Sequence, residues 1–159
     1  MILRAARQTD AFELADLYLR SRRELVAYAP LAHSDSAVRD WIANILIPSA
    51  NVTVACDGDV IVGMAAHSRN EADGTMWLDQ LYVCPRHMRT GIGTALLEHV
   101  KAAAPHDLHL YTFAQNLAAT AFYERHGFVA LAWRDGSDNE ERCPDVHYRW
   151  CRAPASAST

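Results

Sequence analysis

The sequence predicts a three-layer α+β fold, in which a mixed, mostly antiparallel sheet of about seven strands carries helices on both faces. Two observations predict it. Successive strand-like runs follow one another through tight turns in the first half of the chain, which favours an antiparallel meander. A helix opened by glycines then connects two strand-like runs as a β-α-β crossover. The predicted element order is β-α-α-β-β-β-α-β-α-β-β.

The length of 159 residues suits one domain with a single core. We expect this domain to span residues 1–152. The last stretch, "RAPASAST", has few large apolar side chains, so residues 153–159 are predicted to form a flexible tail.

The N-terminal elements are predicted to be one strand and two helices. Residues 1–5 alternate apolar and polar side chains, and Thr9 or Asp10 is placed to cap the first helix. Ser34 or Ser36 is placed to cap the second helix. The predicted apolar face of the second helix consists of Val38, Trp41, Ile42 and Ile45.

The rest of the chain reads as further strands and helices. The β-rich runs "NVTVAC" and "VIVGMAAH" flank Asp57 and Gly58, a dipeptide typical of hairpin turns, and "TMWLDQLYV" supplies the next strand. Apolar residues at helical spacing run from Ile92 towards Pro105. The predicted C-terminal elements are a strand at "LHLYTF", a helix at "NLAATAFYERHG", and strands at "FVALAWR" and "DVHYRWC".

Composition and charge exclude several classes of function. The net charge is −4 and the basic residues are scattered, so the chain lacks the basic patch that nucleic-acid binding requires. No apolar run approaches the roughly 20 residues of a membrane span, and the first residues do not resemble a signal peptide. We therefore expect a cytoplasmic protein without nucleic-acid or membrane partners.

The four cysteines have neither the spacing of a zinc site nor that of a disulfide framework. We expect reduced core thiols and no bound metal. The cysteines are Cys56, Cys84, Cys143 and Cys151.

The stretch "PRHMRTGIGTALLEHV" places two glycines at the start of a helix. Glycines allow close approach of a ligand, and a helix N-terminus presents unpaired N–H groups at the positive end of a dipole. The amides from about Arg89 to Thr94 could therefore hold a phosphate or pyrophosphate, with Arg86 adding charge. The alternative is a tight strand-to-helix turn. The stretch matches neither a P-loop nor the three-glycine dinucleotide motif.

Two segments together, "LDQLYVCPRHMRTGIGTALLEHV" and "YTFAQNLAATAFYERHGF", resemble the two halves of the acetyl-coenzyme A site of GNAT-superfamily N-acetyltransferases. The first resembles the family's strand, its V-x-P and its [QR]-x-x-G-x-[GA]. Met88 stands where the family usually has Gln or Arg, so the resemblance implies that backbone amides hold the pyrophosphate there. The family's N-x-x-A-x-x-F-Y-x-x-x-G-F pattern is filled by Asn116, Ala119, Phe122, Tyr123, Gly127 and Phe128.

The resemblance implies that acetyl-coenzyme A binds between two parallel strands that splay apart, here those ending at Val83 and running from Leu108 to Phe113. Main-chain groups of Leu81 and Val83 would contact the pantetheine arm and the thioester. The cofactor-binding residues implied are Leu81, Tyr82, Val83, Met88, Arg89, Thr90, Gly91, Ile92, Gly93, Thr94, Asn116, Ala119, Phe122 and Tyr123.

The resemblance also implies direct transfer of the acetyl group to an amine. Tyr123 stands at the position of the family's general-acid tyrosine, and the alternative is that it only packs beside Phe122. Asp79 matches a position proposed in some members to act as base, and the alternative is a carboxylate with no catalytic part. His67 and Tyr82 are weaker candidates for the base.

The acceptor implied is the primary amine of a small molecule or a peptide. Arg20, Arg22 and Arg23 could supply a carboxylate clamp, whereas the acidic late loop "RDGSDNEERCPD" would suit a cation or lie in solvent. An alternative function is a non-catalytic module that binds or senses acyl-coenzyme A. By resemblance a homodimer is possible, with "DVHYRWC" as a candidate edge strand.

Overall fold

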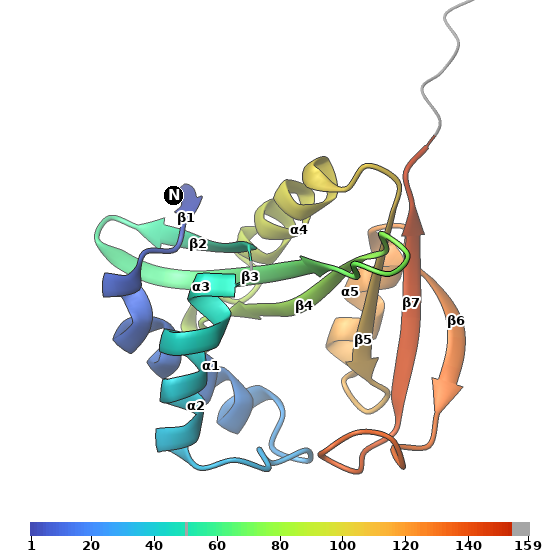
Figure 1. The fold of residues 1–159 in the computed structure, drawn as a ribbon, viewed down its shortest axis with the longest axis horizontal. Coiled ribbons are helices and arrows are strands. Elements are labelled where there is room, and N and C mark those ends of the chain that lie inside the picture. The colour runs from blue at the N-terminus through green and yellow to red at the C-terminus, as the bar shows by residue number, and fades with distance from the viewer. Residues whose placement is uncertain (50, 154–159) are drawn as a thin grey trace, which may run out of the picture.

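The computed structural model describes residues 1–49 and 51–153 and contains one seven-stranded sheet in the order β1-β2-β3-β4-β5-β7-β6 (Figure 1). The strands are β1 (Ile2–Ala5), β2 (Asn51–Asp57), β3 (Val60–Arg69), β4 (Met76–Val83), β5 (Asp107–Phe113), β6 (Val129–Arg134) and β7 (Asp145–Cys151). The helices are α1 (Ala11–Leu25), α2 (Asp35–Trp41), α3 (Ile47–Ser49), α4 (Ile92–Ala103) and α5 (Leu117–Arg125). Short turns precede or extend them at η1 (Gln8–Asp10), η2 (Ile42–Leu46) and η3 (Pro85–His87). The predicted fold class and element order are confirmed, with η2 and α3 continuing the second helix.

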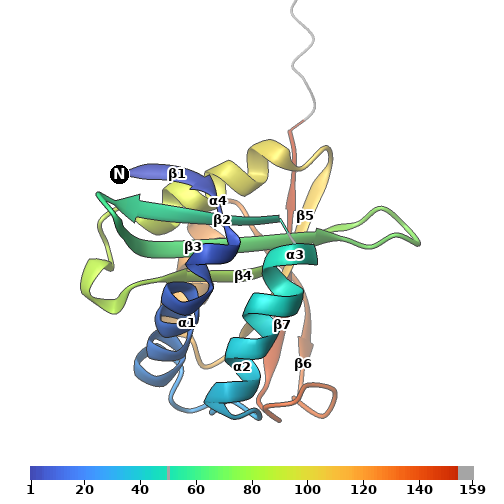
Figure 2. The ribbon, with the colours of Figure 1, turned by 60° about the vertical axis from the view of Figure 1, so that its left-hand side comes forward.

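The sheet separates two apolar cores. Helices α1 and α2 cover one face of β2 to β4, and α4 covers the opposite face (Figures 1 and 2). The first core is built around Leu14, Ile42 and Met64, and the second around Leu96 and Leu108, all fully buried. Since each strand sends alternate side chains to opposite faces, a strand buried on both sides is apolar almost throughout, as "VIVGMAA" is.

The helix starts differ in part from the prediction. Ser34 caps α2, because its Oγ accepts the Ala37 N–H at 3.1 Å. Asp10 stands at the N-cap position of α1, which confirms the predicted start of this helix, but its side chain makes no cap bond. Its carboxylate instead accepts the Arg7 N–H at 2.7 Å and two bonds from the Arg4 guanidinium.

The apolar face of the second helix also differs at its end. Ile45 is 56% exposed, whereas Leu46 is buried with Val38 and Ile42. The helix widens to a π turn over η2, which adds residues per turn and rotates position 46 towards the core in place of position 45.

The one parallel strand pair of the sheet, β4 with β5, separates soon after it begins. Only Met76 with Leu108 and Trp77 with His109 are in register, and the strands then diverge (Figure 1). On the other side of β4, the register with β3 skips Asp79, which marks a β-bulge at that residue. Bulges bend and twist a strand, so this one contributes to the divergence. The result is a gap between the ends of β4 and β5.

Two further expectations need correction. The segment "DVHYRWC" is β7, which lies between β5 and β6, so it is not an edge strand; β6 is. Of the four unpaired cysteines, Cys56 and Cys84 are buried, but Cys151 is exposed and Cys143 lies in the late loop, so these two are not core thiols.

Among the described residues, no helix is long and apolar enough to cross a membrane. All but residue 153 of the predicted tail falls outside the described residues.

We predict that Asp10→Asn lowers stability in a pH-dependent way. The bonds from Arg4 hold the pKa of Asp10 below its ordinary value, so the carboxylate stabilises the fold above the unfolded-state pKa of about 4 and loses this effect as pH falls through the folded-state pKa. At pH 7 the free energy of unfolding of the variant should be about 1–2 kcal/mol lower than that of the wild type. Urea unfolding at pH 7 and at successively lower pH measures the difference, which should shrink towards zero. A pH-independent difference would contradict this account.

Candidate active site

The gap between β4 and β5 exposes backbone groups of β4. The Cys84 N–H donates to the Val62 carbonyl of β3 at 2.8 Å. Because N–H groups of successive strand residues point to opposite edges, those of Val83 and Leu81 point away from β3 and into the gap. The Val83 carbonyl accepts a bond of 3.4 Å from the Ser21 hydroxyl of α1. Strand β4 therefore offers N–H donors along the edge where β5 would pair if the two strands did not diverge.

The predicted glycine cradle lies at the end of this gap, where η3 leads into α4. Arg89 and Gly91 adopt left-handed conformations, with φ of 63° and 86°. Helix α4 begins at Ile92, so the amides of its first turn have no carbonyl partner within the helix. A Cβ built on Gly91 would meet nothing within 4 Å. The loop thus presents unpaired amides at the positive end of the α4 dipole.

The two segments that carry the sequence resemblance lie next to each other in space. The Thr94 hydroxyl contacts the His126 Nε2 at 3.2 Å, which joins the start of α4 to the end of α5. A Cβ on Gly93 would lie 3.6 Å from the Phe122 ring. Asn116 caps α5, since its side-chain oxygen accepts the Ala119 N–H at 3.1 Å.

Tyr123 of α5 reaches the gap from the α4 side of the sheet. Its ring packs at 5.3 Å from that of Phe122 and at 5.5 Å from that of Phe128, and it is 8% exposed. Burial raises the pKa of Tyr123, and the nearby Tyr82 adds to the effect. The phenol therefore stays protonated at neutral pH and can donate its proton.

Asp79 reaches the same gap from the bulge of β4. The carboxylate is open to a cavity whose walls remove part of its hydration, and this burial raises the pKa of Asp79 against an opposing hydrogen bond with Ser68. Asp79 thus combines an exposed side chain with a carboxyl whose pKa lies above its ordinary value. His67, whose pKa is lowered by burial, does not line this cavity, whereas Tyr82 does.

A single cavity of about 360 Å³ joins these groups to the far side of the sheet. Its walls come from α1, β4, β5, α5 and the segment between β6 and β7. The lining residues named from the sequence are Arg22, Asp79, Leu81, Tyr82, Asn116, Ala119 and Tyr123, together with Arg134, Asn139, Glu141 and Asp145 of the acidic late loop. The lining residues that sequence reasoning missed include Tyr18, Val26, Thr112 and Phe113. They come from distant elements and share no motif, so no sequence signal marks them. The cradle residues 88–94 lie beyond this cavity, at the mouth of the gap.

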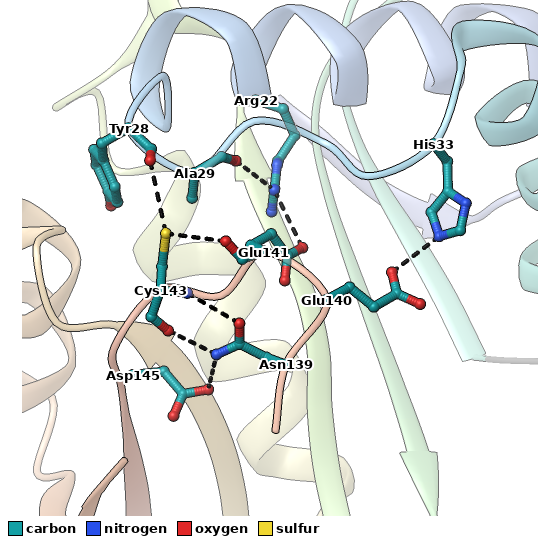
Figure 3. A network of polar contacts seen from close by, with 9 residues as sticks. All are labelled: Arg22, Tyr28, Ala29, His33, Asn139, Glu140, Glu141, Cys143 and Asp145. Atoms are coloured by element: carbon teal, nitrogen blue, oxygen red, sulfur yellow. Dashed lines mark hydrogen bonds and ion pairs between the residues drawn. The ribbon is translucent and has the colours of Figure 1, made fainter. Parts of the chain in front are cut away.

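The late loop closes one side of the cavity. At its base, Arg134 donates two bonds to Asp145, the shorter 2.5 Å. Gly136 has φ of 93°, and a Cβ there would lie 2.6 Å from the Cys143 backbone, so the turn needs glycine. The acidic residue Glu141 contacts Arg22 of α1 at 3.3 Å (Figure 3). The loop therefore contacts the end of α1 and the segment after it through Glu141, Glu140 and Cys143, while Asp135 and Asp138 are exposed.

A family profile described as the acetyltransferase (GNAT) family matches residues 13–128, which is most of the chain. The chain belongs to the GNAT acetyltransferase family. The match covers α1 through α5 and thus includes both the cradle and Tyr123.

Individual proteins agree with the GNAT assignment. Peptidyl-lysine N-acetyltransferase YiaC of Escherichia coli K12 is 39% identical over 61 residues, which are 37% of this chain and 41% of that relative's length. YncA of Salmonella typhimurium, solved with its cofactor acetyl-CoA, has a TM-score of 0.74 and 19% identity, over 100% of this chain and 98% of that one. PaiA N-acetyltransferase of Thermoplasma acidophilum, solved with coenzyme A, has a TM-score of 0.72 and 18% identity, over 95% and 98%. At these identities, the two structures show the shared fold.

Proposed function

We propose that this GNAT protein transfers an acetyl group from acetyl-coenzyme A directly to a primary amine, within a ternary complex. One observation carries the proposal: a protonated, buried phenol, a carboxylate of raised pKa and unpaired strand N–H groups open on the same gap. When bound, acetyl-coenzyme A supplies the acetyl group as an activated thioester.

The residues at the mouth of the gap fit such a cofactor. The first-turn amides of α4 and the left-handed Arg89 and Gly91 form a cradle for a pyrophosphate. The space over Gly91 is empty of protein atoms within 4 Å of a Cβ position. In this proposal Leu81 and Val83 hold the pantetheine arm by their N–H groups. The Met88 side chain donates no hydrogen bond to the pyrophosphate, which is held by backbone amides. The remaining cofactor contacts proposed are Tyr82, Thr90, Ile92, Gly93, Thr94, Asn116, Ala119 and Phe122.

Three groups of this chain would share the chemistry. The Val83 N–H donates to the acetyl oxygen as negative charge develops there, a contribution of about 3 kcal/mol for one donor. Tyr123 donates its proton to the departing sulfur. Asp79 accepts, directly or through water, the proton that the amine must lose before it attacks.

The name of one relative, YiaC, supports a primary amine as the acceptor. The name of YiaC gives it a peptidyl lysine, whose side chain carries a primary amine, and the matched stretch is 39% identical to this chain. Since that match spans 41% of YiaC, the acceptor of this chain is proposed at the level of the amine alone. A homodimer formed through the edge strand β6 is a second, separate proposal, which the mass in solution tests.

Calorimetric titration with acetyl-coenzyme A, followed by thiol release against a panel of primary amines, tests the function. We expect binding in the micromolar range and thiol release that depends on the amine. Binding without release for every amine would favour the alternative, a module that binds or senses acyl-coenzyme A. Absence of binding would exclude both.

We predict that Asp79→Asn lowers kcat at pH 7 by about ten-fold to a hundred-fold, because the amine loses its proton acceptor. Because the pKa of Asp79 is raised in the folded state, the ionised carboxylate lowers the free energy of unfolding above that pKa. Well below pH 4 the carboxyl is protonated in both the folded and the unfolded state, so this effect vanishes. The variant should therefore melt at least as high as the wild type at pH 7, and the two should agree at low pH. Asp59→Asn, in the turn between β2 and β3, is the control. Unchanged kcat in the Asp79 variant would remove the base assignment.

A further inference from the structure

The acceptor side of the cavity holds a buried cation, Arg22 of α1, whose hydrogen-bonding capacity is incompletely used (Figure 3). Its side chain is 7% exposed. One nitrogen, Nη2, donates to the Ala29 carbonyl at 2.9 Å and contacts a Glu141 oxygen at 3.3 Å. Its Nε is buried and has no hydrogen-bond partner among the described residues. A buried cation normally has a full set of partners, because dehydration of an unpaired charge is costly.

The ion pair between Arg22 and Glu141 has poorer geometry than the other arginine–carboxylate pair that lines the cavity. Arg134 and Asp145 form a bidentate pair with bonds of 2.7 and 2.5 Å. Glu141 offers Arg22 a single contact of 3.3 Å, although a guanidinium can bind both oxygens of one carboxylate. Arg22 and Arg134 are the cations that line the cavity among the described residues. Arg22 is therefore the one that retains capacity for another carboxylate.

Glu141 stands on a segment that can move without breaking the sheet. The loop reaches the N-terminal helices through Glu141, through a 2.9 Å contact between His33 and Glu140 at the surface, and through a weak 3.6 Å bond from the Cys143 thiol to the Tyr28 carbonyl (Figure 3). Within the loop, Asn139 bonds to the Cys143 backbone at 2.7 and 3.2 Å, and at the end of the loop the Ala114 N–H donates to the Pro144 carbonyl at 2.9 Å. Withdrawal of the Glu141 side chain costs one long ion contact.

Aromatic side chains of the cavity wall surround the Arg22 guanidinium, and the Tyr82 hydroxyl also forms a hydrogen bond with it. The rings of Tyr18 and Tyr82 lie 5.1 Å apart, and the phenol of Tyr82 is close enough to influence both Arg22 and Tyr123 electrostatically. The Phe113 ring lies 5.5 Å from the Arg22 guanidinium carbon. Arg22 and Asp79 both line this cavity, so an acceptor inside it can face Arg22 with one end and Asp79 with the other.

We propose that Arg22 binds a carboxylate of the acceptor, and that Glu141 occupies this place until the acceptor arrives. The acceptor class is a small amine that also carries a carboxylate, of which free amino acids are the simplest members. Its ammonium end would lie towards Asp79, which has no cationic partner among the described residues, and its carboxylate would complete the partners of Arg22. This inference rests on the proposed acetyl transfer.

Matched pairs of acceptors test the inference. Thiol release is measured with each of the twenty common L-amino acids, with the carboxamide of each, and with a lysine peptide blocked at both ends. We expect kcat/KM of an accepted amino acid to exceed that of its carboxamide by about ten-fold or more, as charge-assisted hydrogen bonds allow. Arg22→Gln should bring this ratio near one, mainly through KM, with unchanged calorimetric affinity for acetyl-coenzyme A.

Glu141→Gln gives an independent test, because the substitution keeps the size of the side chain and removes only its charge. Removing the competing carboxylate should lower KM for the amino acid by about three-fold to ten-fold and leave KM of the carboxamide unchanged. Arg23→Gln is the control. Arg23 is the neighbour of Arg22 on α1, but its side chain is exposed and pairs with Asp35 outside the cavity. If Arg22→Gln does not fold by circular dichroism, the Glu141 variant decides.

Several results would overturn the inference while leaving acetyl transfer intact. They are equal rates for amino acids and carboxamides, transfer to the blocked peptide alone, or a Glu141→Gln variant whose KM rises for both members of a pair. The last would mean that Glu141 holds the amine. Absence of transfer to every amine, despite bound acetyl-coenzyme A, would instead reject the proposed function and this inference with it.

Discussion

Replacing Tyr123 by phenylalanine is expected to lower kcat by about ten-fold to a thousand-fold, the usual range for loss of a general acid. The ring would still pack between Phe122 and Phe128, so the fold and the affinity for acetyl-coenzyme A should stay close to those of the wild type. Only the proton beside the departing sulfur is lost. Because burial raises the pKa of Tyr123, the wild type should show no alkaline loss of kcat from this residue at or below its ordinary pKa of about 10.

Tyr148→Phe is the matched control for this variant. Tyr148 is fully buried, lies 6.4 Å from Tyr123 ring to ring, and donates its hydroxyl to Glu124 at 3.1 Å, outside the cavity. Its loss should reduce stability slightly and leave kcat unchanged. Equal kcat in the Tyr123 variant and the wild type, measured by thiol release at saturating substrates, would exclude Tyr123 as the acid.

Replacing Gly93 by glutamate is expected to weaken binding of acetyl-coenzyme A by about thirty-fold or more, since a side chain and a negative charge would enter the pyrophosphate cradle. The fold should tolerate the change. A Cβ at Gly93 makes only ordinary contacts of 3.6 Å with Phe122 and Val83, and a carboxylate in the first turn of α4 suits the helix dipole. Packing therefore does not require glycine at this position, whereas the proposed close approach of the cofactor does.

The control for Gly93→Glu is His99→Glu, which adds the same charge to the exposed side of α4 beyond its first turn. Calorimetric titration of both variants separates a local effect from the change in net charge. Gly91→Glu is a poorer test, because φ of 86° at Gly91 would add backbone strain to the loss of binding. A folded Gly93→Glu variant with the affinity of the wild type would contradict the cradle.

Much of the fold and the family followed from local patterns in the sequence. The helix cap at Ser34, the hairpin at Asp57 and Gly58, and the strand lengths depend on neighbouring residues, which a sequence displays directly. The cradle glycines and the segment from Asn116 to Phe128 form contiguous motifs for the same reason. Predictions failed where non-local geometry intervened, as at Ile45, where a π turn rotates the helix, and at "DVHYRWC", whose place inside the sheet depends on strand order.

The sequence by itself thus determined the element order, the family and the residues of the cradle, because each rests on side chains close together along the chain. Only the tertiary structure decided which of three arginines on α1 faces the cavity. Arg22 enters it, whereas Arg23 pairs with Asp35 at the surface. The bulge at Asp79, the divergence of β4 from β5 and the contact between Arg22 and Glu141 likewise join segments far apart in sequence. Such contacts arise from packing of the whole sheet against its helices, and no local pattern encodes them.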